Sequence, residues 1–126
     1  MPELHLTKCE LEVMDVVWRK KRATVQEVCD ALSRDLAYTT VMTTLKVLEE
    51  KRGVLQREKS GRAYVYEPVV SRDEVRQQMA GDLTQRLFAG SVKTLVLSLL
   101  GTRKVSKSEI RELKQVIESL DQEDAA

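Results

Sequence analysis

The stretch YTTVMTTLKVLEEK, residues 38–51, combines a helical spacing of apolar residues with an unusual number of threonines. Four of the six residues from 39 to 44 are threonine. Each threonine in a helix interior costs roughly 0.5 kcal/mol relative to alanine, so four of them cost about 2 kcal/mol. A helix that carries this cost has a use for the hydroxyl groups, and the direction in which they point indicates what that use is.

At about 100° per residue, the apolar residues of this helix fall on one side and most of the threonines on the other. The inward arc is expected to contain Ala37, Tyr38, Val41, Met42, Leu45 and Leu48. The outward face is expected to contain Thr39, Thr40, Thr43, Lys46, Val47 and Glu50, with Thr44 at its edge. The pattern therefore predicts that most threonines lie on the surface beside a lysine.

Two helices are expected before this one, because a capping-box motif precedes each of them. TKCE and TVQE place a threonine three residues before a glutamate, and predict helices over residues 8–21 and 25–33. The same motif recurs as SRDE and SKSE before two apolar-periodic segments further along the chain. Trp18 falls on the apolar face of the first helix and is expected in the core.

After Gly53 the pattern changes to two β-prone runs, VLQREK and AYVYEP, on either side of SGR. Gly61 can supply the positive φ that a tight hairpin turn needs. The hairpin tip carries Lys59 and Arg62. From residue 46 to residue 62 there are six basic and three acidic residues, although the whole chain has a net charge of only +1. The excess positive charge is local to the threonine-rich helix and the hairpin, which favours a polyanionic partner there.

Three helices followed by a two-stranded hairpin is the element order of a winged helix-turn-helix, whose third helix enters the DNA major groove. We therefore expect a mainly α protein with a small β-hairpin wing, in which residues 1–70 form a DNA-binding domain. Threonine suits the groove because its hydroxyl reaches base edges and its methyl can contact the thymine methyl. The expected contacts to double-stranded DNA are made by Thr39, Thr40, Thr43, Lys46, Arg57, Lys59 and Arg62. A winged helix that binds proteins, without sequence-specific DNA binding, is the alternative.

Residues 71–126 predict three more helices, with more apolar surface than so short a segment can bury within itself. A second copy of the chain would cover this surface, so residues 71–126 are expected to form a helical homodimerisation domain. The side chains expected at that interface are apolar and recur at helical spacing: Met79, Leu83, Leu87, Leu95, Leu99, Ile110, Leu113, Ile117 and Leu120.

The composition, with 42% hydrophobic and 33% charged residues, is typical of a soluble globular protein. No apolar run approaches the roughly 20 residues that span a bilayer, and no secretory signal is visible, so we expect a cytoplasmic protein without membrane insertion. One histidine and two separated cysteines do not make a zinc site, and no cofactor is expected. The sequence has no phosphate loop and no nucleophile elbow, which argues against an enzyme.

The chain also resembles a known family, through LTKCELEVMDVVWRKKRATVQEVCDAL, LAYTTVMTTLKVLEEK, GVLQREKSGRAYVYEP and SVKTLVLSLL. These segments are similar to the penicillinase-repressor family of bacterial transcription regulators, which includes β-lactamase and methicillin-resistance repressors and copper-responsive relatives. The resemblance implies a homodimeric repressor that binds an inverted repeat built on TACA and TGTA half-sites. It implies DNA reading by Thr39, Thr40, Thr43 and Lys46, although relatives often have a basic residue at the positions of Met42 or Val47.

The resemblance further implies a route of induction. Relatives of the β-lactamase type leave DNA after a membrane sensor-protease triggers their cleavage, at a position that corresponds here to Ser98–Leu99. The residue types differ from the asparagine–phenylalanine pair of the best-known relatives, and burial in a dimer core is the simpler interpretation of this segment. Copper-responsive relatives carry a C-terminal cysteine cluster that the tail ESLDQEDAA lacks.

Overall fold

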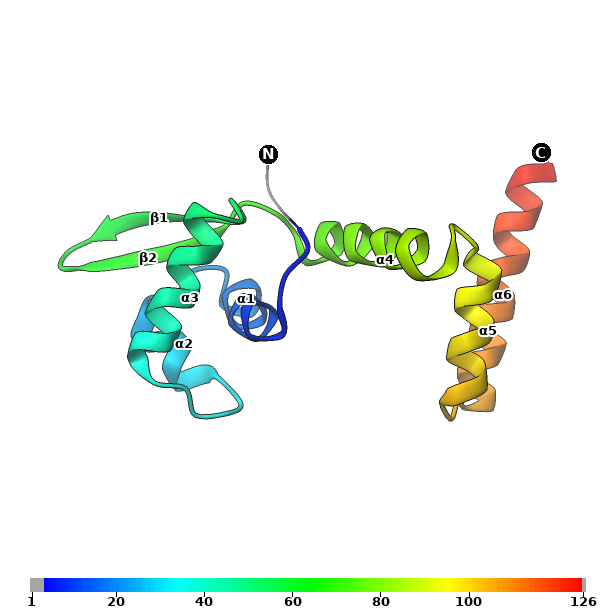
Figure 1. Ribbon diagram of the computed structural model, residues 1–126, viewed down its shortest axis with the longest axis horizontal. Coiled ribbons are helices and arrows are strands. Elements are labelled where there is room, and N and C mark those ends of the chain that lie inside the picture. The colour runs from blue at the N-terminus through cyan, green and yellow to red at the C-terminus, as the bar shows by residue number, and fades with distance from the viewer. Residues whose placement is uncertain (1–3, 126) are drawn as a thin grey trace. The chain divides into compact units, whose positions relative to one another are not determined.

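The computed structural model describes residues 4–125 and contains six helices and one two-stranded antiparallel sheet within that range (Figure 1). In chain order the elements are α1 (Lys8–Lys20), α2 (Val25–Ala31), α3 (Tyr38–Glu50), β1 (Leu55–Ser60), β2 (Ala63–Pro68), α4 (Arg72–Phe88), α5 (Val92–Thr102) and α6 (Lys107–Ala125). The expected fold class, a mainly α winged helix-turn-helix followed by three helices, is confirmed. Helix α6 continues past Leu120, where the apolar spacing stops.

The capping boxes begin the helices where the sequence predicts. The hydroxyls of Thr7 and Thr24 accept the amides of Glu10 and Glu27, and each glutamate accepts the threonine amide in return. Ser71 and Glu74 exchange the same two hydrogen bonds before α4. These bonds satisfy amides that the first helical turn leaves unpaired, so the sequence fixes the helix starts locally.

The core lies among α1, α2, α3, the hairpin and the start of α4. Its buried apolar residues are Leu6, Val13, Met14, Val16, Val17, Ala23, Val28, Val41, Leu45, Leu48, Val54, Leu55, Tyr66, Val70 and Val75. Trp18 packs against this cluster, as predicted. A buried carboxylate also belongs to this region, because Glu10 accepts hydrogen bonds from Nε of Arg52 at 3.2 and 3.3 Å and joins the start of α1 to the end of α3.

The hairpin pairs Leu55 with Pro68 through Ser60 with Ala63, leaving Gly61 and Arg62 as the turn. Gly61 has φ of 64°, the left-handed value expected of it. Ala23, between α1 and α2, exchanges two backbone hydrogen bonds with Tyr66 of β2, at 3.0 and 2.8 Å. The wing is thereby attached to the base of the helix-turn-helix.

The described chain divides into two compact units, of which the first ends at Leu83 and the second begins at Thr84. The division falls inside α4. The assignment of residues 1–70 to DNA binding and 71–126 to dimerisation stays a prediction. In the second unit α5 and α6 run in opposite directions (Figure 1), and none of their described side chains is buried.

Candidate nucleic-acid interface

The outward face of α3 carries the threonines that the sequence places there. Val41, Leu45 and Leu48 are fully buried, whereas Thr39, Thr40, Thr43 and Lys46 are exposed. Thr44 is half-buried, and its hydroxyl donates to the carbonyl oxygen of Thr40 at 2.8 Å. Three of the four threonine hydroxyls therefore remain on the surface of this helix.

The first turn of α3 differs from those of α1 and α2. Its N-cap residue is Ala37, which makes no side-chain capping bond. The backbone amides at this end are consequently available to an outside acceptor, and a helix N-terminus favours an anion such as a phosphate. Thr39 and Thr40 lie on the same exposed turn.

A groove of about 540 Å³ separates α3 from the wing. Its lining comes from the start of α2 with its N-cap, from α3 and from the hairpin with its turn: Thr24, Val25, Gln26, Tyr38, Met42, Thr43, Lys46, Arg57, Arg62, Ala63, Tyr64 and Tyr66. Four of the predicted DNA contacts, Thr43, Lys46, Arg57 and Arg62, therefore meet in one place. Thr39, Thr40 and Lys59 lie outside this lining.

The prediction that Tyr38 and Met42 face the core is wrong. Their side chains are 49% and 43% exposed, and both line the groove. They stand at one edge of the apolar arc of α3, next to Lys46 on the helix surface, and the core covers only the middle of that arc. The sequence contained one sign of this exposure. The apolar arc of α3 is wider than the stripe of Val41, Leu45 and Leu48 that the core buries. A methionine and a tyrosine beside Thr43 add apolar contact surface to a face that otherwise offers hydrogen bonds and charge.

Arg57 is held in place on the wing. Its Nε lies 3.4 Å from Oε2 of Glu49, at the end of α3, and its guanidinium stands 4.3 Å from the centre of the Tyr64 ring. The negative charge of Glu49 is the main reason why the pKa of the Arg57 guanidinium is raised above its usual value. The sequence did not identify Tyr64 and Glu49 as partners of Arg57. Tyr64 meets Arg57 within the hairpin, where Arg57 pairs with Tyr66 and Tyr64 is its diagonal neighbour. Glu49 meets Arg57 only because the wing packs against α3. An anion that binds Arg57 would therefore compete with Glu49 for the guanidinium.

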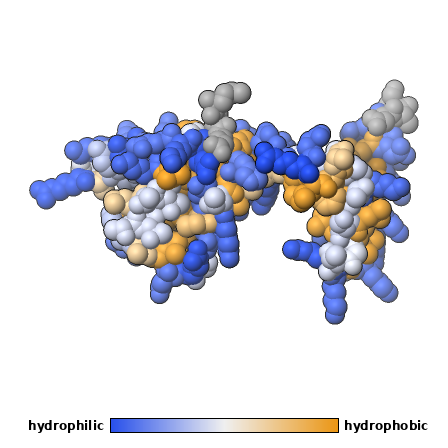
Figure 2. Space-filling view, in the orientation of Figure 1, coloured by the Kyte–Doolittle hydropathy of each residue, from blue (hydrophilic) through white to orange (hydrophobic). Residues whose placement is uncertain are grey.

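The remaining predicted cations differ from Arg57, because Lys46, Lys59 and Arg62 have no ion pair with any described residue. Arg22, by contrast, lies 3.9 Å from Glu58 and 3.5 Å from Glu67, and so compensates the two acids of the hairpin. Figure 2 shows the resulting hydrophilic surface over the hairpin. The local positive charge predicted from the sequence is thus borne by three side chains that a polyanion can reach.

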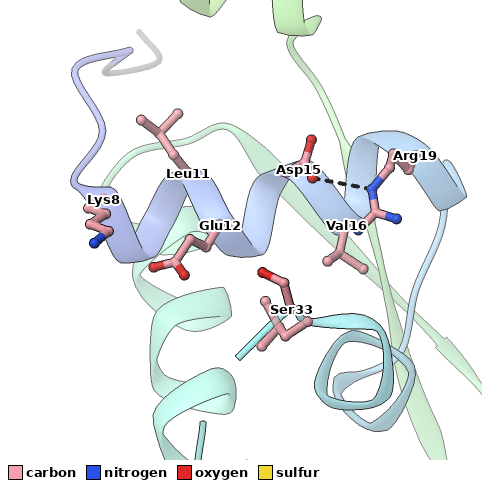
Figure 3. Close-up of a pocket in the computed structure, with 8 residues that line it drawn as sticks. Lys8, Leu11, Glu12, Asp15, Val16, Arg19 and Ser33 are labelled. Atoms are coloured by element: carbon pink, nitrogen blue, oxygen red, sulfur yellow. Dashed lines mark hydrogen bonds and ion pairs between the residues drawn. The ribbon is translucent and has the colours of Figure 1, made fainter. Parts of the chain in front are cut away.

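A second pocket lies between α1 and the end of α2 (Figure 3). The acids that line it are engaged: Asp15 pairs with Arg19 at 3.2 Å, and Glu12 accepts two hydrogen bonds from Arg34 at 2.7 and 2.9 Å. The Arg34 hydrogen bond is the main reason why the pKa of Glu12 is lowered. Among the side chains that the structure describes, no three of His, Cys, Asp or Glu gather as a metal site would require.

The residues predicted for dimerisation lie mostly on exposed surface. Leu87, Ile117 and Leu120 are 71%, 60% and 57% exposed, whereas Met79 packs against the core of the first unit. Figure 2 shows apolar residues over α5 and α6. Further exposed apolar residues of these helices, which the prediction omitted, are Val92, Val96, Leu97, Leu100 and Val116. Ser98 and Leu99, the predicted cleavage position, lie inside α5 and are exposed.

Comparison with known proteins agrees with this architecture. The penicillinase repressor family matches residues 6–119, and the chain belongs to this family. It is 31% identical over 116 residues to the penicillinase repressor of Bacillus licheniformis, covering 90% of both chains. It is 40% identical over 121 residues to the transcriptional regulator BlaI of Mycobacterium tuberculosis, covering 93% of this chain and 86% of that one.

Two solved structures are similar as well. The solution structure of the DNA-binding domain of the repressor BlaI covers 59% of this chain and 93% of its own, with 32% identity and a TM-score of 0.51. A mutant MarR from E. coli, solved with operator DNA, has a TM-score of 0.52 and covers 93% of this chain and 76% of its own. At 16% identity, the MarR structure shows the winged-helix fold alone. No described helix is both long and apolar enough to cross a membrane.

Proposed function

We propose that this protein is a DNA-binding transcriptional repressor that reads an inverted-repeat operator as a homodimer and acts in the cytoplasm. The observation that carries the proposal is the groove between α3 and the wing, where the exposed Thr43 and Lys46 of α3 face Arg57 and Arg62 of the hairpin. Hydroxyls on a helix that fits the major groove can read base edges, and the cations beside them neutralise phosphates.

The groove accounts for one part of the interface, and the start of α3 accounts for another. The uncapped amides there, together with Thr39 and Thr40, offer a phosphate several donors at a helix N-terminus. Lys59, on the exposed edge of β1, reaches a flanking phosphate from the wing. In this arrangement Thr43 contributes sequence preference, Lys59 and Arg62 contribute mainly affinity, and Lys46 contributes to both.

The second unit supports the homodimer that we propose. Helices α5 and α6 carry at least ten apolar side chains that are 38% or more exposed in the single chain. Exposed apolar patches of such extent are typical of permanent interfaces. Residues 71–126 would form the dimer interface, and residues 1–70 of each copy would bind one half-site of the operator. Two weak half-site contacts would then act together.

Relief of repression by proteolysis is the remaining part of the proposal, with a membrane sensor-protease as the partner that initiates it. Ser98–Leu99 lies within the regular helix α5, so a protease could engage it only after that helix opens locally. A cut there would divide the apolar surface of α5. The dimer would lose buried area, and each monomer would hold a single half-site.

The test is fluorescence anisotropy of the full chain on two duplexes, one with a TACA–TGTA inverted repeat and one with the same bases scrambled, at about 50 and about 200 mM salt. Tight binding to the repeat, two chains per duplex and a steep fall with salt are expected. Equal and weak binding to both duplexes, and to duplexes selected from random DNA, would contradict sequence-specific recognition. Binding of neither duplex at low salt would favour a winged helix that contacts proteins.

A further inference from the structure

The end of α1 and the turn that follows it carry a run of four basic residues, from Arg19 to Arg22. The two arginines are engaged, because Nε of Arg19 and Nε of Arg22 lie 3.2 and 3.5 Å from carboxylate oxygens. Lys20 and Lys21, between them, are exposed and form no ion pair with any residue that the structure describes. The run therefore presents two uncompensated positive charges at one point of the surface.

Lys21 also has a backbone conformation that a side chain disfavours. It is the C-cap residue of α1, with φ of 71° and ψ of −32°, outside the regions that residues with a Cβ normally adopt. Among the described residues other than glycine, only Ala89 shares a positive φ. After α3 and α4 the chain places glycine at such positions, Gly53 and Gly90. The helix dipole favours a cation at the end of α1, but it does not require a side chain where glycine fits without strain. A strained residue of this kind suggests a function outside the fold.

The turn lies at the rim of the groove between α3 and the wing. Ala23, two residues after Lys21, exchanges two backbone hydrogen bonds with Tyr66, whose side chain lines that groove. Thr24, the next residue, lines the groove as well. Three residues of extended chain span at most about 11 Å, so Lys21 cannot be far from this lining.

A duplex in the groove would bring phosphates to the same turn. In helix-turn-helix proteins the helix before the recognition helix crosses the DNA backbone. That helix is α2 here, and the charge of Lys20 already acts on it. The hydrogen bond from the Thr24 amide is the main reason why the pKa of Glu27 in α2 is lowered, and Lys20 contributes. We propose that Lys20 and Lys21 bind the backbone phosphates that α2 crosses, as a phosphate contact beside the groove. The inference rests on the proposed function.

Such a contact adds affinity without sequence preference, because a phosphate is the same beside every base. A lysine ammonium is a compact charge on a flexible stem and needs no fixed direction of approach. The contact is additional to those of the groove and wing, so the binding should depend on salt more steeply than the groove and wing cations alone would make it. The strained backbone acts on the free protein, whereas the phosphate contact forms only on DNA. The two effects can therefore be measured separately.

The experiment is an anisotropy titration of the full chain on the repeat and on its scramble, at four or more salt concentrations. Lys21→Gln removes the charge and keeps a side chain of similar length at the same backbone position. For a dimer, the slope of log K against log salt should become less steep by about 1.8, and affinity for both duplexes at about 0.1 M salt should fall about tenfold or more. Lys21→Arg keeps the charge and should leave the slope unchanged.

Lys21→Gly separates the contact from a structural role, with a thermal melt of the free protein as the second readout. The melting temperature should rise by about 2 °C or more, since glycine relieves the backbone strain, while affinity for DNA falls as it does for Lys21→Gln. A purely structural residue would not give a more stable protein that binds DNA more weakly.

Lys51 provides the matched control. It is the C-cap residue of α3, is exposed, and forms no ion pair within the described part of the chain, but its φ is −89° and it does not line the groove. Lys51→Ala removes the same charge from the end of another helix. It should change the slope by less than about 0.5.

The outcomes separate the inference from the proposed function. An unchanged slope for Lys21→Gln would overturn the inference, and so would a loss confined to the repeat or an equal slope change for Lys51→Ala. A lower melting temperature for Lys21→Gly would overturn it too, because the lysine would then serve the fold. A wild-type chain that binds repeat and scramble alike would instead overturn sequence-specific recognition. The slope on either duplex would still decide whether Lys21 binds phosphate.

Discussion

Replacing Lys59 with alanine tests the electrostatic half of the proposed interface. Three cations of the groove and wing form no ion pair with a described acid: Lys46, Lys59 and Arg62. A dimer would therefore present six such cations to DNA. Each phosphate neutralised contributes about 0.9 to the slope of log K against log salt, so six predict a slope of about −5.4. Between about 50 and about 200 mM salt the affinity should fall by about three decades.

Lys59→Ala removes two of the six contacts from the dimer. The slope should become less steep by about 1.8, and affinity for the repeat and for its scramble should fall by the same factor. The measurement is the anisotropy titration described above, repeated at four or more salt concentrations. A slope that stays the same would mean that Lys59 does not reach a phosphate. A loss confined to the repeat would mean that it reads a base.

Arg57→Ala is the informative comparison, because Arg57 already has a partner. Contact with a phosphate requires the guanidinium to leave or share Glu49, which lies 3.4 Å away. The gain in counterion release is then offset by the separation of an existing ion pair. The slope should consequently change less for Arg57→Ala than for Lys59→Ala. An equal or larger change would show that Glu49 releases Arg57 on binding.

Three further changes test the base-reading face, the buried ion pair and the turn after α4. Thr43→Ala should narrow the free-energy gap between repeat and scramble by about 1–3 kcal/mol in the same titration, and unchanged discrimination would remove Thr43 from the reading face. Glu10→Gln takes away the charge that Arg52 faces while keeping the acceptor for the Thr7 amide, and should lower the free energy of unfolding by about 2–3 kcal/mol in urea melts. A loss below about 1 kcal/mol would contradict the importance of that pair. Ala89→Gly should raise the free energy of unfolding by about 0.5–1 kcal/mol, since Ala89 has φ of 49° and is exposed; a lower melting temperature would refute this reasoning.

Local signals in the sequence account for most of the first unit. The start of each of α1, α2 and α4 is determined by a hydroxyl and a glutamate three residues apart, and these contacts form within one helical turn. The hairpin turn depends on Gly61 at the position that needs positive φ. Such features involve neighbours in the chain, and the sequence predicts them because no tertiary packing is needed to form them.

The exposure of the groove residues depends on parts of the chain that are distant in sequence. For these residues the prediction from the sequence was partly wrong. Helical periodicity assigns Tyr38 and Met42 to the apolar arc, but it cannot tell how much of that arc the core covers. The hairpin is bonded to Ala23, before α2, through Tyr66, and a groove lies between α3 and the wing with Tyr38 and Met42 in its lining. The contacts of Arg72 with Asp15 and Trp18 join residues more than fifty positions apart, and no spacing rule connects them.

The high threonine content of α3 is explained by what each threonine does. Thr44 forms a hydrogen bond with the carbonyl oxygen of Thr40 inside the helix, which compensates part of its low helix propensity. Thr39, Thr40 and Thr43 have no such use within the fold, because they are exposed and α3 is already anchored by Val41, Leu45 and Leu48. Residues that lower helix stability at surface positions, where stronger helix formers would fit, point to selection for an external partner. Under the proposed function, the exposed threonines, the uncapped start of α3 and the cations Lys46, Lys59 and Arg62 would all serve the same partner, a DNA duplex.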